Sequence, residues 1–178
     1  MRGAKIPKKE EQEMKGVITE IERFSLKDGP GIRTTVFFKG CNMACKWCHN
    51  PETLSVKPQL MVYPKNCIGC GACVKACKVG ARTIENGMLH YDRSVCTDCG
   101  ACAQNCFTGA LVMSGKEMTV EEVMSEILQD RAYYRNSGGG VTLSGGEVST
   151  QPEFAVELLK ALKNENISTA IETILYAP

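Results

Sequence analysis

Eleven cysteines dominate the chemistry available to this chain of 178 residues. No apolar secretory signal precedes them, since the first fourteen residues are polar and carry charges of both signs. In a reducing cytoplasm, cysteines serve metal ligation rather than disulfide bonding. An odd number of cysteines is also awkward for a fully paired disulfide framework. The cysteines therefore predict a cytoplasmic metalloprotein.

Eight cysteines form two runs of identical spacing, C-x2-C-x2-C-x3-C, that start 29 residues apart at Cys67 and Cys96. Bacterial two-cluster ferredoxins have this duplicated run, and the fourth cysteine of each run binds the other cluster. The first predicted [4Fe-4S] cluster therefore has the ligands Cys67, Cys70, Cys73 and Cys106. The second has the ligands Cys96, Cys99, Cys102 and Cys77.

Structural zinc is the alternative metal, because zinc sites also use C-x2-C pairs. A tetrahedral zinc site takes two such pairs and has no use for a duplicated four-cysteine run. Lys78 and Phe107 stand where the ferredoxin run usually continues with Pro. That Pro helps to set a turn but binds no iron, so we favour iron–sulfur clusters over zinc.

Three cysteines remain, Cys41, Cys45 and Cys48, and no further cysteine completes a set of four. A cubane held by three thiolates keeps an open coordination position on one iron. Catalytic zinc sites likewise keep an open position, whereas structural zinc sites do not, so this site is expected to be catalytic. S-adenosyl-L-methionine can fill that position through its amino and carboxylate groups. One electron then cleaves the sulfonium bond to give methionine and a 5′-deoxyadenosyl radical. The cysteines thus predict three [4Fe-4S] clusters, one of them catalytic.

The elements around this loop must position it. Residues 34–38 are β-branched or aromatic and predict a buried strand, after which Gly40 turns the chain into the cysteine loop. Trp47 can pack along the adenine of the cofactor, although a place in the core is the alternative for this residue. Further along, residues 119–122 form a capping box that opens an amphipathic helix reaching about Asp130.

Residues 138–147 combine a glycine lead-in, a short apolar strand and a Ser-Gly-Gly-Glu turn. Pro152 begins a helix whose apolar residues are Phe154, Val156, Leu158, Leu159 and Leu162. Residues 169–173 predict another strand, and strand–helix–strand alternation indicates a parallel α/β sheet. Ligands of such sheets bind beyond the carboxyl ends of the strands. The cysteine loop, residues 144–147 and Glu172–Thr173 should therefore lie at one edge.

Three stretches in this order, residues 28–34 (DGPGIRT), 41–52 and 137–147, resemble the glycyl radical enzyme activating enzymes of the radical SAM superfamily. The resemblance runs from about residue 16 to the end, and the ferredoxin-like stretch is similar to that of larger members. It implies an α/β fold: the N-terminal part of a partial (β/α) barrel of radical SAM type, with an inserted α+β ferredoxin-like domain and the C-terminal half of the barrel absent. The implied domains are a disordered leader (1–15), the first part of the core (16–60), the insertion (61–115) and the continued core (116–178).

The resemblance also implies an anaerobic oxidoreductase that abstracts hydrogen from one glycine of a partner glycyl radical enzyme. A reduced flavodoxin or ferredoxin would supply electrons, and the accessory clusters would either relay them or have a structural or docking role. Cofactor contacts are expected at Trp47, Cys48, His49, Gly145, Gly146, Glu147, Glu172 and Thr173. Because family members continue for about half a barrel more, we expect this chain to assemble clusters but to activate its partner poorly or not at all.

A formal net charge of +1 gives no reason to expect nucleic acid or an anionic membrane as a partner, and a monomer is expected. No apolar stretch approaches the length of a membrane span. One alternative function is a ferredoxin-type electron carrier, which leaves the three-cysteine loop without a role. The other is a radical SAM enzyme of another branch that acts on a small molecule or a peptide.

Overall fold

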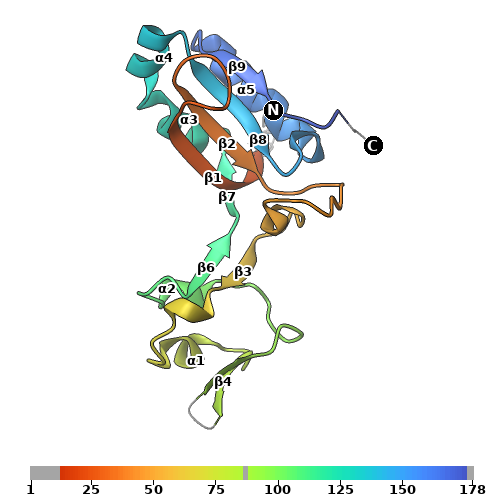
Figure 1. Ribbon diagram of the computed structural model, residues 1–178, viewed down its shortest axis with the longest axis vertical. Helices are drawn as coiled ribbons and strands as arrows, with labels where there is room; N and C mark the ends of the chain where they lie inside the picture. The colour runs from red at the N-terminus through yellow and green to blue at the C-terminus, as the bar shows by residue number, and fades with distance from the viewer. Residues whose placement is uncertain (1–12, 86–87, 176–178) are drawn as a thin grey trace, which may run out of the picture.

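The computed structural model describes residues 13–85 and 88–175. An α/β body and a smaller cysteine-rich segment lie one below the other (Figure 1). The predicted leader covers residues 1–15, of which 1–12 lie outside the described residues. Lys15 already belongs to the first strand.

A five-stranded sheet with the order β7-β1-β2-β8-β9 forms the centre of the body. Its strands are β1 (Lys15–Ser25), β2 (Arg33–Phe38), β7 (Lys116–Thr119), β8 (Gly140–Gly145) and β9 (Ser168–Ile171). Strands β2, β8 and β9 are parallel, with Val36 opposite Leu143 and Leu143 opposite Ile171. The parallel sheet and its three predicted strands are thereby confirmed. Strand β1, antiparallel to β2 and to β7, was not predicted.

Three helices accompany the sheet: α3 (Val120–Leu128), α4 (Arg131–Ser137) and α5 (Pro152–Asn164). The predicted capping box is confirmed, since Glu122 N donates to Thr119 Oγ1 at 3.2 Å and Thr119 N donates to Glu122 Oε2 at 2.9 Å. Helix α3 ends before Asp130, which instead precedes α4 and accepts a hydrogen bond of 2.8 Å from the hydroxyl of Thr34. Pro152 begins α5 as predicted.

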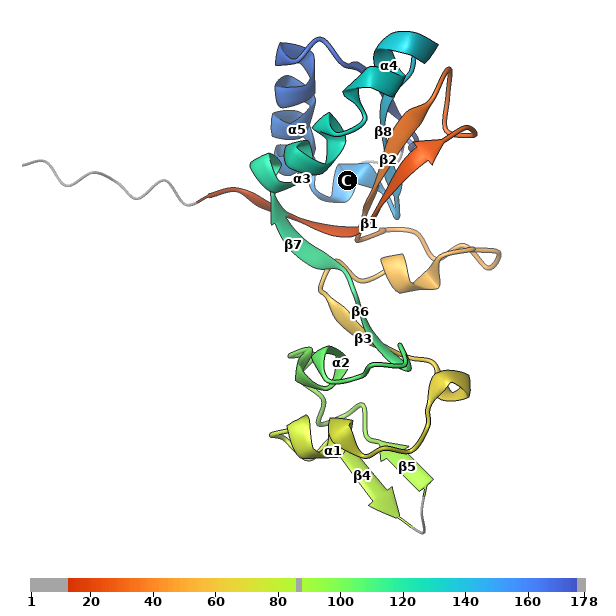
Figure 2. The same cartoon turned by 90° about the vertical axis from the view of Figure 1, so that its left-hand side faces the viewer.

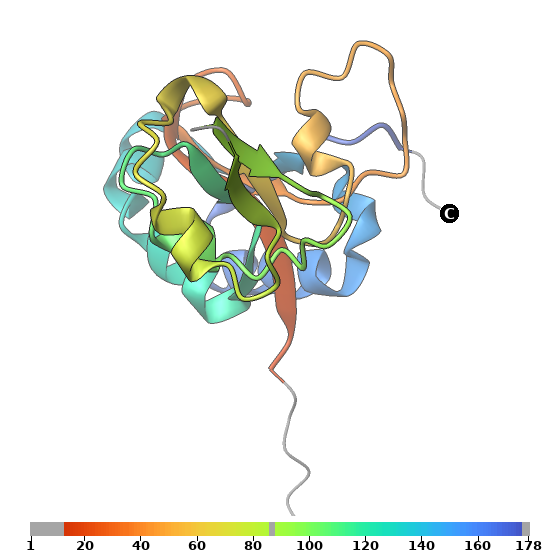
Figure 3. The same ribbon diagram turned by 90° about the horizontal axis from the view of Figure 1, so that it is seen from below.

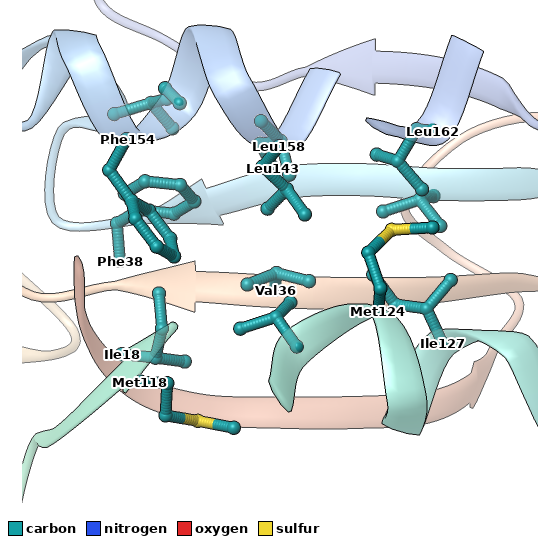
Figure 4. Close-up of a cluster of buried hydrophobic side chains, with 14 of the residues drawn as sticks. Ile18, Val36, Phe38, Met118, Met124, Ile127, Leu143, Phe154, Leu158 and Leu162 are labelled. Carbon is teal, nitrogen blue, oxygen red and sulfur yellow. The ribbon is translucent and has the colours of Figure 1, made fainter. Parts of the chain in front are cut away.

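The core lies between the sheet and helices α3 and α5, which cover one of its faces (Figure 2). Phe38 and Phe154 pack edge to face there, with ring centroids 6.0 Å apart, and Leu143 and Leu158 lie beside them (Figure 4). Val156, predicted on or near the apolar face of α5, is 48 % exposed. Two residues correspond to about 200° around a helix, so Val156 lies opposite the buried Phe154.

The cysteine-rich segment begins and ends with two antiparallel strands, β3 (Gln59–Val62) and β6 (Leu111–Ser114), which pair Gln59 with Ser114. Between them lie α1 (Ala72–Ala76), the hairpin of β4 (Arg82–Glu85) and β5 (Met88–Tyr91), and α2 (Ala101–Gln104). Each short helix follows a left-handed glycine, Gly71 (φ 72°) or Gly100 (φ 76°), so the sequence repeat is also a repeat of backbone conformation. Figure 3 views the molecule from the end that this yellow and green segment forms.

Three short 3-10 turns complete the described chain: η1 (Pro51–Thr53), η2 (Pro64–Asn66) and η3 (Val148–Thr150). Within residues 13–85 and 88–175, no helix has both the length and the apolar character needed to cross a membrane.

Candidate iron–sulfur and cofactor site

The three-cysteine loop leaves β2 through Gly40, whose φ of 111° favours glycine. Gly40 N donates to Thr53 O at 2.7 Å and Cys41 N donates to Leu54 O at 3.2 Å, so η1 fixes the start of the loop. Cys48 N donates to Cys45 O at 3.1 Å, which forms a turn at its end. The three thiols are half-buried and free. The loop thus presents them from a fixed base while they remain accessible.

Trp47 lies on this loop with 85 % of its side chain exposed. A place in the core, the alternative considered for this residue, is therefore wrong. An exposed Trp costs hydrophobic free energy that a stacked partner recovers. His49, two residues further on, is also exposed.

The Ser-Gly-Gly-Glu turn ends β8 directly against the base of the cysteine loop. Gly146 N donates to Phe38 O at 2.9 Å, and Glu147 N donates to Gly40 O at 2.8 Å. A Cβ atom on Gly146 would lie 2.2 Å from Gly40 O, which no side chain can do without displacing backbone. The structure therefore brings the turn and the loop together, and only glycine permits this approach.

Glu147 is 1 % exposed, and its carboxylate accepts three hydrogen bonds from protein groups. The donors are Thr173 Oγ1 at 2.7 Å, Ile174 N at 2.9 Å and Ser149 N at 3.1 Å. Burial raises the pKa of the Glu147 carboxyl, but these donors together outweigh burial and lower the pKa below its ordinary value. The carboxylate therefore anchors the chain that follows β9 to the glycine turn.

Glu172 and Thr173 follow β9 and are exposed. Ser144 donates to Glu172 Oε2 at 2.6 Å, and Glu172 N donates to Leu143 O at 2.9 Å, which extends the pairing of β9 with β8. The ends of β2, β8 and β9 therefore gather Cys41, Gly146, Glu147 and Thr173 at one edge. This is the arrangement predicted for the carboxyl ends of the parallel strands.

Replacing Glu147 by Gln should lower the free energy of unfolding by about 1–3 kcal/mol, because an amide N–H₂ would face groups that donate hydrogen bonds. Since the folded pKa is lowered, the stabilisation by Glu147 is complete above the ordinary pKa of glutamate. It is lost as the pH falls through the lower folded value. Urea unfolding at neutral and acid pH measures both effects.

The matched control is Glu157→Gln on α5, where the partly exposed carboxylate forms an ion pair with Lys160. An exposed pair of this kind contributes about 0–1 kcal/mol. Equal losses in the two variants, or the same acid dependence in Glu147→Gln as in the wild type, would contradict the anchoring role of Glu147.

Lys39, which the sequence analysis missed, is fully buried directly before Gly40. Its ammonium donates to Glu52 O and lies 3.5 Å from Ser114 Oγ, while its own carbonyl accepts from Gln151 Nε2 at 2.7 Å. Burial lowers the pKa of this ammonium. Lys39 therefore joins the cysteine loop to the end of β6, where the cysteine-rich segment returns to the sheet. A lysine in the sequence gives no sign of such burial.

The other eight cysteines line two cavities in the cysteine-rich segment. A cavity of ≈ 510 Å³ is lined by Cys67, Cys70, Cys73 and Cys106. A second cavity of ≈ 20 Å³ is lined by Cys77, Cys96, Cys99 and Cys102. These are the two sets that the spacing predicts, with the fourth cysteine of each run in the other set. The donor sets fit two cubanes; the first cavity has room for one, and the second must widen at the exposed Cys99.

Within residues 13–85 and 88–175, no three His, Cys, Asp or Glu side chains converge as ligands of a single metal ion. The four ligands of a cubane bind four separate irons. They surround a volume rather than meet at a point, as the cysteines around the two cavities do.

The electrostatics of these thiols differ within each run. Burial raises the pKa of Cys73 and of Cys102. The positive charge of Arg82 lowers the pKa of both thiols and offsets part of this increase. In Cys77 and Cys106 burial also raises the pKa, but hydrogen bonds, chiefly from backbone N–H groups that follow each cysteine, outweigh it and lower the pKa. The thiolate, which is the form that binds iron, is therefore favoured at the fourth cysteine of each run.

The chain is similar to one protein family model and to several curated proteins. Residues 27–176 match the family described as "4Fe-4S single cluster domain". The benzylsuccinate synthase activating enzyme of Thauera aromatica is 49% identical over an alignment of 162 positions, which covers 88% of this chain and 49% of that protein. The choline trimethylamine-lyase activating enzyme of Oleidesulfovibrio alaskensis is 47% identical over an alignment of 168 positions, which covers 93% of this chain and 54% of that protein.

The indoleacetate decarboxylase activating enzyme of Tractidigestivibacter scatoligenes is 42% identical over an alignment of 181 positions, which covers 96% of this chain and 57% of that protein. The chain spans about half the length of the curated relatives that it matches.

Proposed function

The chain belongs to the 4Fe-4S single cluster domain family, and we propose that it forms part of a radical SAM enzyme that activates a glycyl radical enzyme. The observation that carries the proposal is the loop of Cys41, Cys45 and Cys48, which has three thiols, no fourth cysteine and a base bonded to the Gly146–Glu147 turn. The relatives named above are activating enzymes and align with 88–96% of this chain. Because the chain spans about half of each relative, the activity of the whole protein is part of the proposal.

In this proposal the sheet is the N-terminal part of a partial (β/α) barrel of radical SAM type. Support comes from the parallel strands β2, β8 and β9 and from the helices on one face of the sheet. Residues 61–115 are a ferredoxin-like insertion between core segments 16–60 and 116–178. The pairing of β3 with β6 and the repeat around Gly71 and Gly100 support it.

Cys41, Cys45 and Cys48 would hold the catalytic cluster, and the cysteines around the two cavities would hold two accessory clusters. When bound, the reduced catalytic cluster and S-adenosylmethionine supply the 5′-deoxyadenosyl radical that removes hydrogen from a glycine. Trp47 offers its exposed ring to the adenine. Gly146 lets the backbone approach the cofactor closely.

Thr173 and Glu172 would complete the cofactor site at the end of β9. Glu147 fixes Thr173 through the 2.7 Å hydrogen bond, and Ser144 fixes Glu172 through the 2.6 Å hydrogen bond. Glu147 itself has protein donors on both of its oxygens. Its contribution in this proposal is to hold the strand end in position beside the expected cofactor contact.

The partner is a glycyl radical enzyme, and a flavodoxin or ferredoxin is the electron donor. The protein acts as a monomer in an anaerobic cytoplasm. The near-neutral net charge of +1 supports a protein partner rather than nucleic acid. Each relative is named as the activating enzyme of a different enzyme, so sequence similarity alone does not select one partner.

Reductive cleavage of S-adenosylmethionine tests the proposal. The chain is reconstituted with iron and sulfide without oxygen, reduced with dithionite and incubated with S-adenosylmethionine. We expect methionine and 5′-deoxyadenosine in equal amounts by liquid chromatography. A chain that takes up electrons and leaves S-adenosylmethionine intact would instead support the ferredoxin-type electron carrier.

A further inference from the structure

The internal repeat contains one conspicuous mismatch. Cys67 corresponds to Cys96 at an offset of 29 residues, and the same offset pairs Arg82 with Leu111. Both positions are buried, with Arg82 2 % exposed and Leu111 4 % exposed. One half of the repeat therefore buries a leucine where the other half buries a cation. Burying an unpaired charge is strongly unfavourable, so Arg82 needs a partner.

The described side chains around Arg82 compensate little of its charge. The Arg82 guanidinium lies over the ring of Tyr91, with Cζ 3.9 Å from the ring centroid. Such a cation–π contact is too weak to offset the burial of a charge. The Nε and Nη2 atoms of Arg82 are buried and have no hydrogen-bond partner among the described residues. Among the described side chains, the ion pairs of this segment join Arg93 to Asp98 and do not involve Arg82.

Arg82 also lines both of the cysteine cavities, the larger one with Cys73 and Cys106 and the smaller one with Cys77 and Cys102. Leu111 lines the larger cavity only. The guanidinium thus stands between two sites whose thiolates are negatively charged when they bind iron. Within the described part of the chain, no acceptor pairs with its Nε and Nη2 nitrogens.

We propose that Arg82 stands between the two accessory clusters, donates its unpartnered Nε–H and Nη2–H groups to their sulfur atoms, and thereby makes the clusters easier to reduce. The inference rests on the proposed accessory clusters. Hydrogen bonds to sulfur and the net charge around a cluster are among the factors that set its reduction potential. Reduction adds one electron to a cluster and moves no proton, since Arg82 stays charged. A nearby cation therefore stabilises the reduced form more than the oxidised form.

The two reduced clusters also repel one another, because each gains a negative charge. A cation between them attracts both added electrons and so offsets this repulsion, which helps both clusters to hold an electron at the same time. Leucine, the residue at the matching position of the repeat, offers neither charge nor donor.

Arg82→Leu, which gives both halves of the repeat the same residue, is the first test. The reconstituted 178-residue chain is titrated with redox mediators, and the reduced accessory clusters are followed by electron paramagnetic resonance. At a fixed potential we expect the ratio of reduced to oxidised clusters to fall on the order of tenfold, equivalent to about 59 mV for a one-electron couple. Arg82→Lys keeps the charge but not the planar fork of donors, and should give a smaller fall.

The matched control is Lys65→Leu, which removes one positive charge from an exposed position of the same segment. Water screens that charge, so the ratio should stay close to that of the wild type. Iron analysis accompanies each titration. Wild-type protein with iron for only one cluster would overturn the accessory clusters themselves.

Full iron content in Arg82→Leu with an unchanged titration would overturn the role of Arg82 and leave the clusters in place. If Arg82→Leu loses iron from the accessory clusters, Arg82→Lys is the deciding variant. A lower ratio of reduced to oxidised clusters in Arg82→Lys supports the inference, and a titration like that of the wild type contradicts it.

Discussion

Replacing Cys41, Cys45 and Cys48 together by Ala should abolish the formation of 5′-deoxyadenosine and leave about eight of about twelve iron atoms in the chain. The reason is that these thiols lie on a separate loop, whereas the other eight cysteines surround two cavities of their own. The loop is held by backbone hydrogen bonds from Gly40 and Cys41, which alanine at position 41 retains. The fold and the accessory sites should therefore survive the substitution.

The paired control replaces Cys99 and Cys102, which line the smaller cavity, by Ala. This variant should lose about four iron atoms and keep a cofactor-dependent response at the three-cysteine loop. Iron and sulfide analysis with product chromatography measures both variants. Cofactor cleavage that persists without Cys41, Cys45 and Cys48 would show that the catalytic cluster lies elsewhere.

Gly146→Ala should lower the free energy of unfolding by about 2–4 kcal/mol and reduce cofactor cleavage by at least tenfold. Its Cβ atom would lie 2.2 Å from Gly40 O and 3.1 Å from Thr53 O, and both of these atoms are backbone. The added methyl group must therefore separate the glycine turn from the cysteine loop. This motion breaks the hydrogen bonds from Gly146 to Phe38 and from Glu147 to Gly40.

Gly138→Ala is the control for this substitution, because it separates steric overlap from backbone strain. Gly138 has a φ of +70° and open space around its Cα, so alanine there costs about 1 kcal/mol through strain alone. Urea unfolding and product analysis of the two variants give the comparison. If Gly146→Ala is no more harmful than Gly138→Ala, the close contact between turn and loop does not determine the site.

Local signals in the sequence predicted those parts of the fold that depend on neighbouring residues. The capping box at Thr119, the start of α5 at Pro152 and the β-branched run of β2 all have causes within a few residues. The parallel arrangement of β2, β8 and β9 follows from their helical connections, since a parallel pair needs a crossover.

Other features depend on distant residues, and the sequence did not reveal them. Strand β1 pairs with β7, about 100 residues further along the chain, and no local pattern specifies that partner. Helix α4 begins at Arg131, and Asp130, which the sequence placed at the end of α3, is the N-cap of α4. Arg23 and Thr34 bind the Asp130 carboxylate there. The burial of Lys39 and Glu147 likewise follows from partners on other elements.

The candidate site also has features that the sequence predicted and features that it did not reveal. Spacing alone predicted which cysteines belong together, because the ferredoxin run exchanges its fourth cysteine between clusters, and the two cavities have the same cysteine sets. The cysteine spacing gave no reason to single out Arg82. Arginine residues mostly lie on the surface, and the burial of Arg82 is known from the structure alone. Its correspondence with Leu111 in the repeat is the signal in the sequence that could have found it.

The central claim is that the three-cysteine loop holds a cluster with one iron open to S-adenosylmethionine. Low-temperature electron paramagnetic resonance of the reduced chain, with and without S-adenosylmethionine, tests this claim most directly. We predict that the cofactor changes one cluster signal and that this change is absent when Cys41, Cys45 and Cys48 are Ala. Two interacting cluster signals that stay the same when the cofactor is added would contradict the claim.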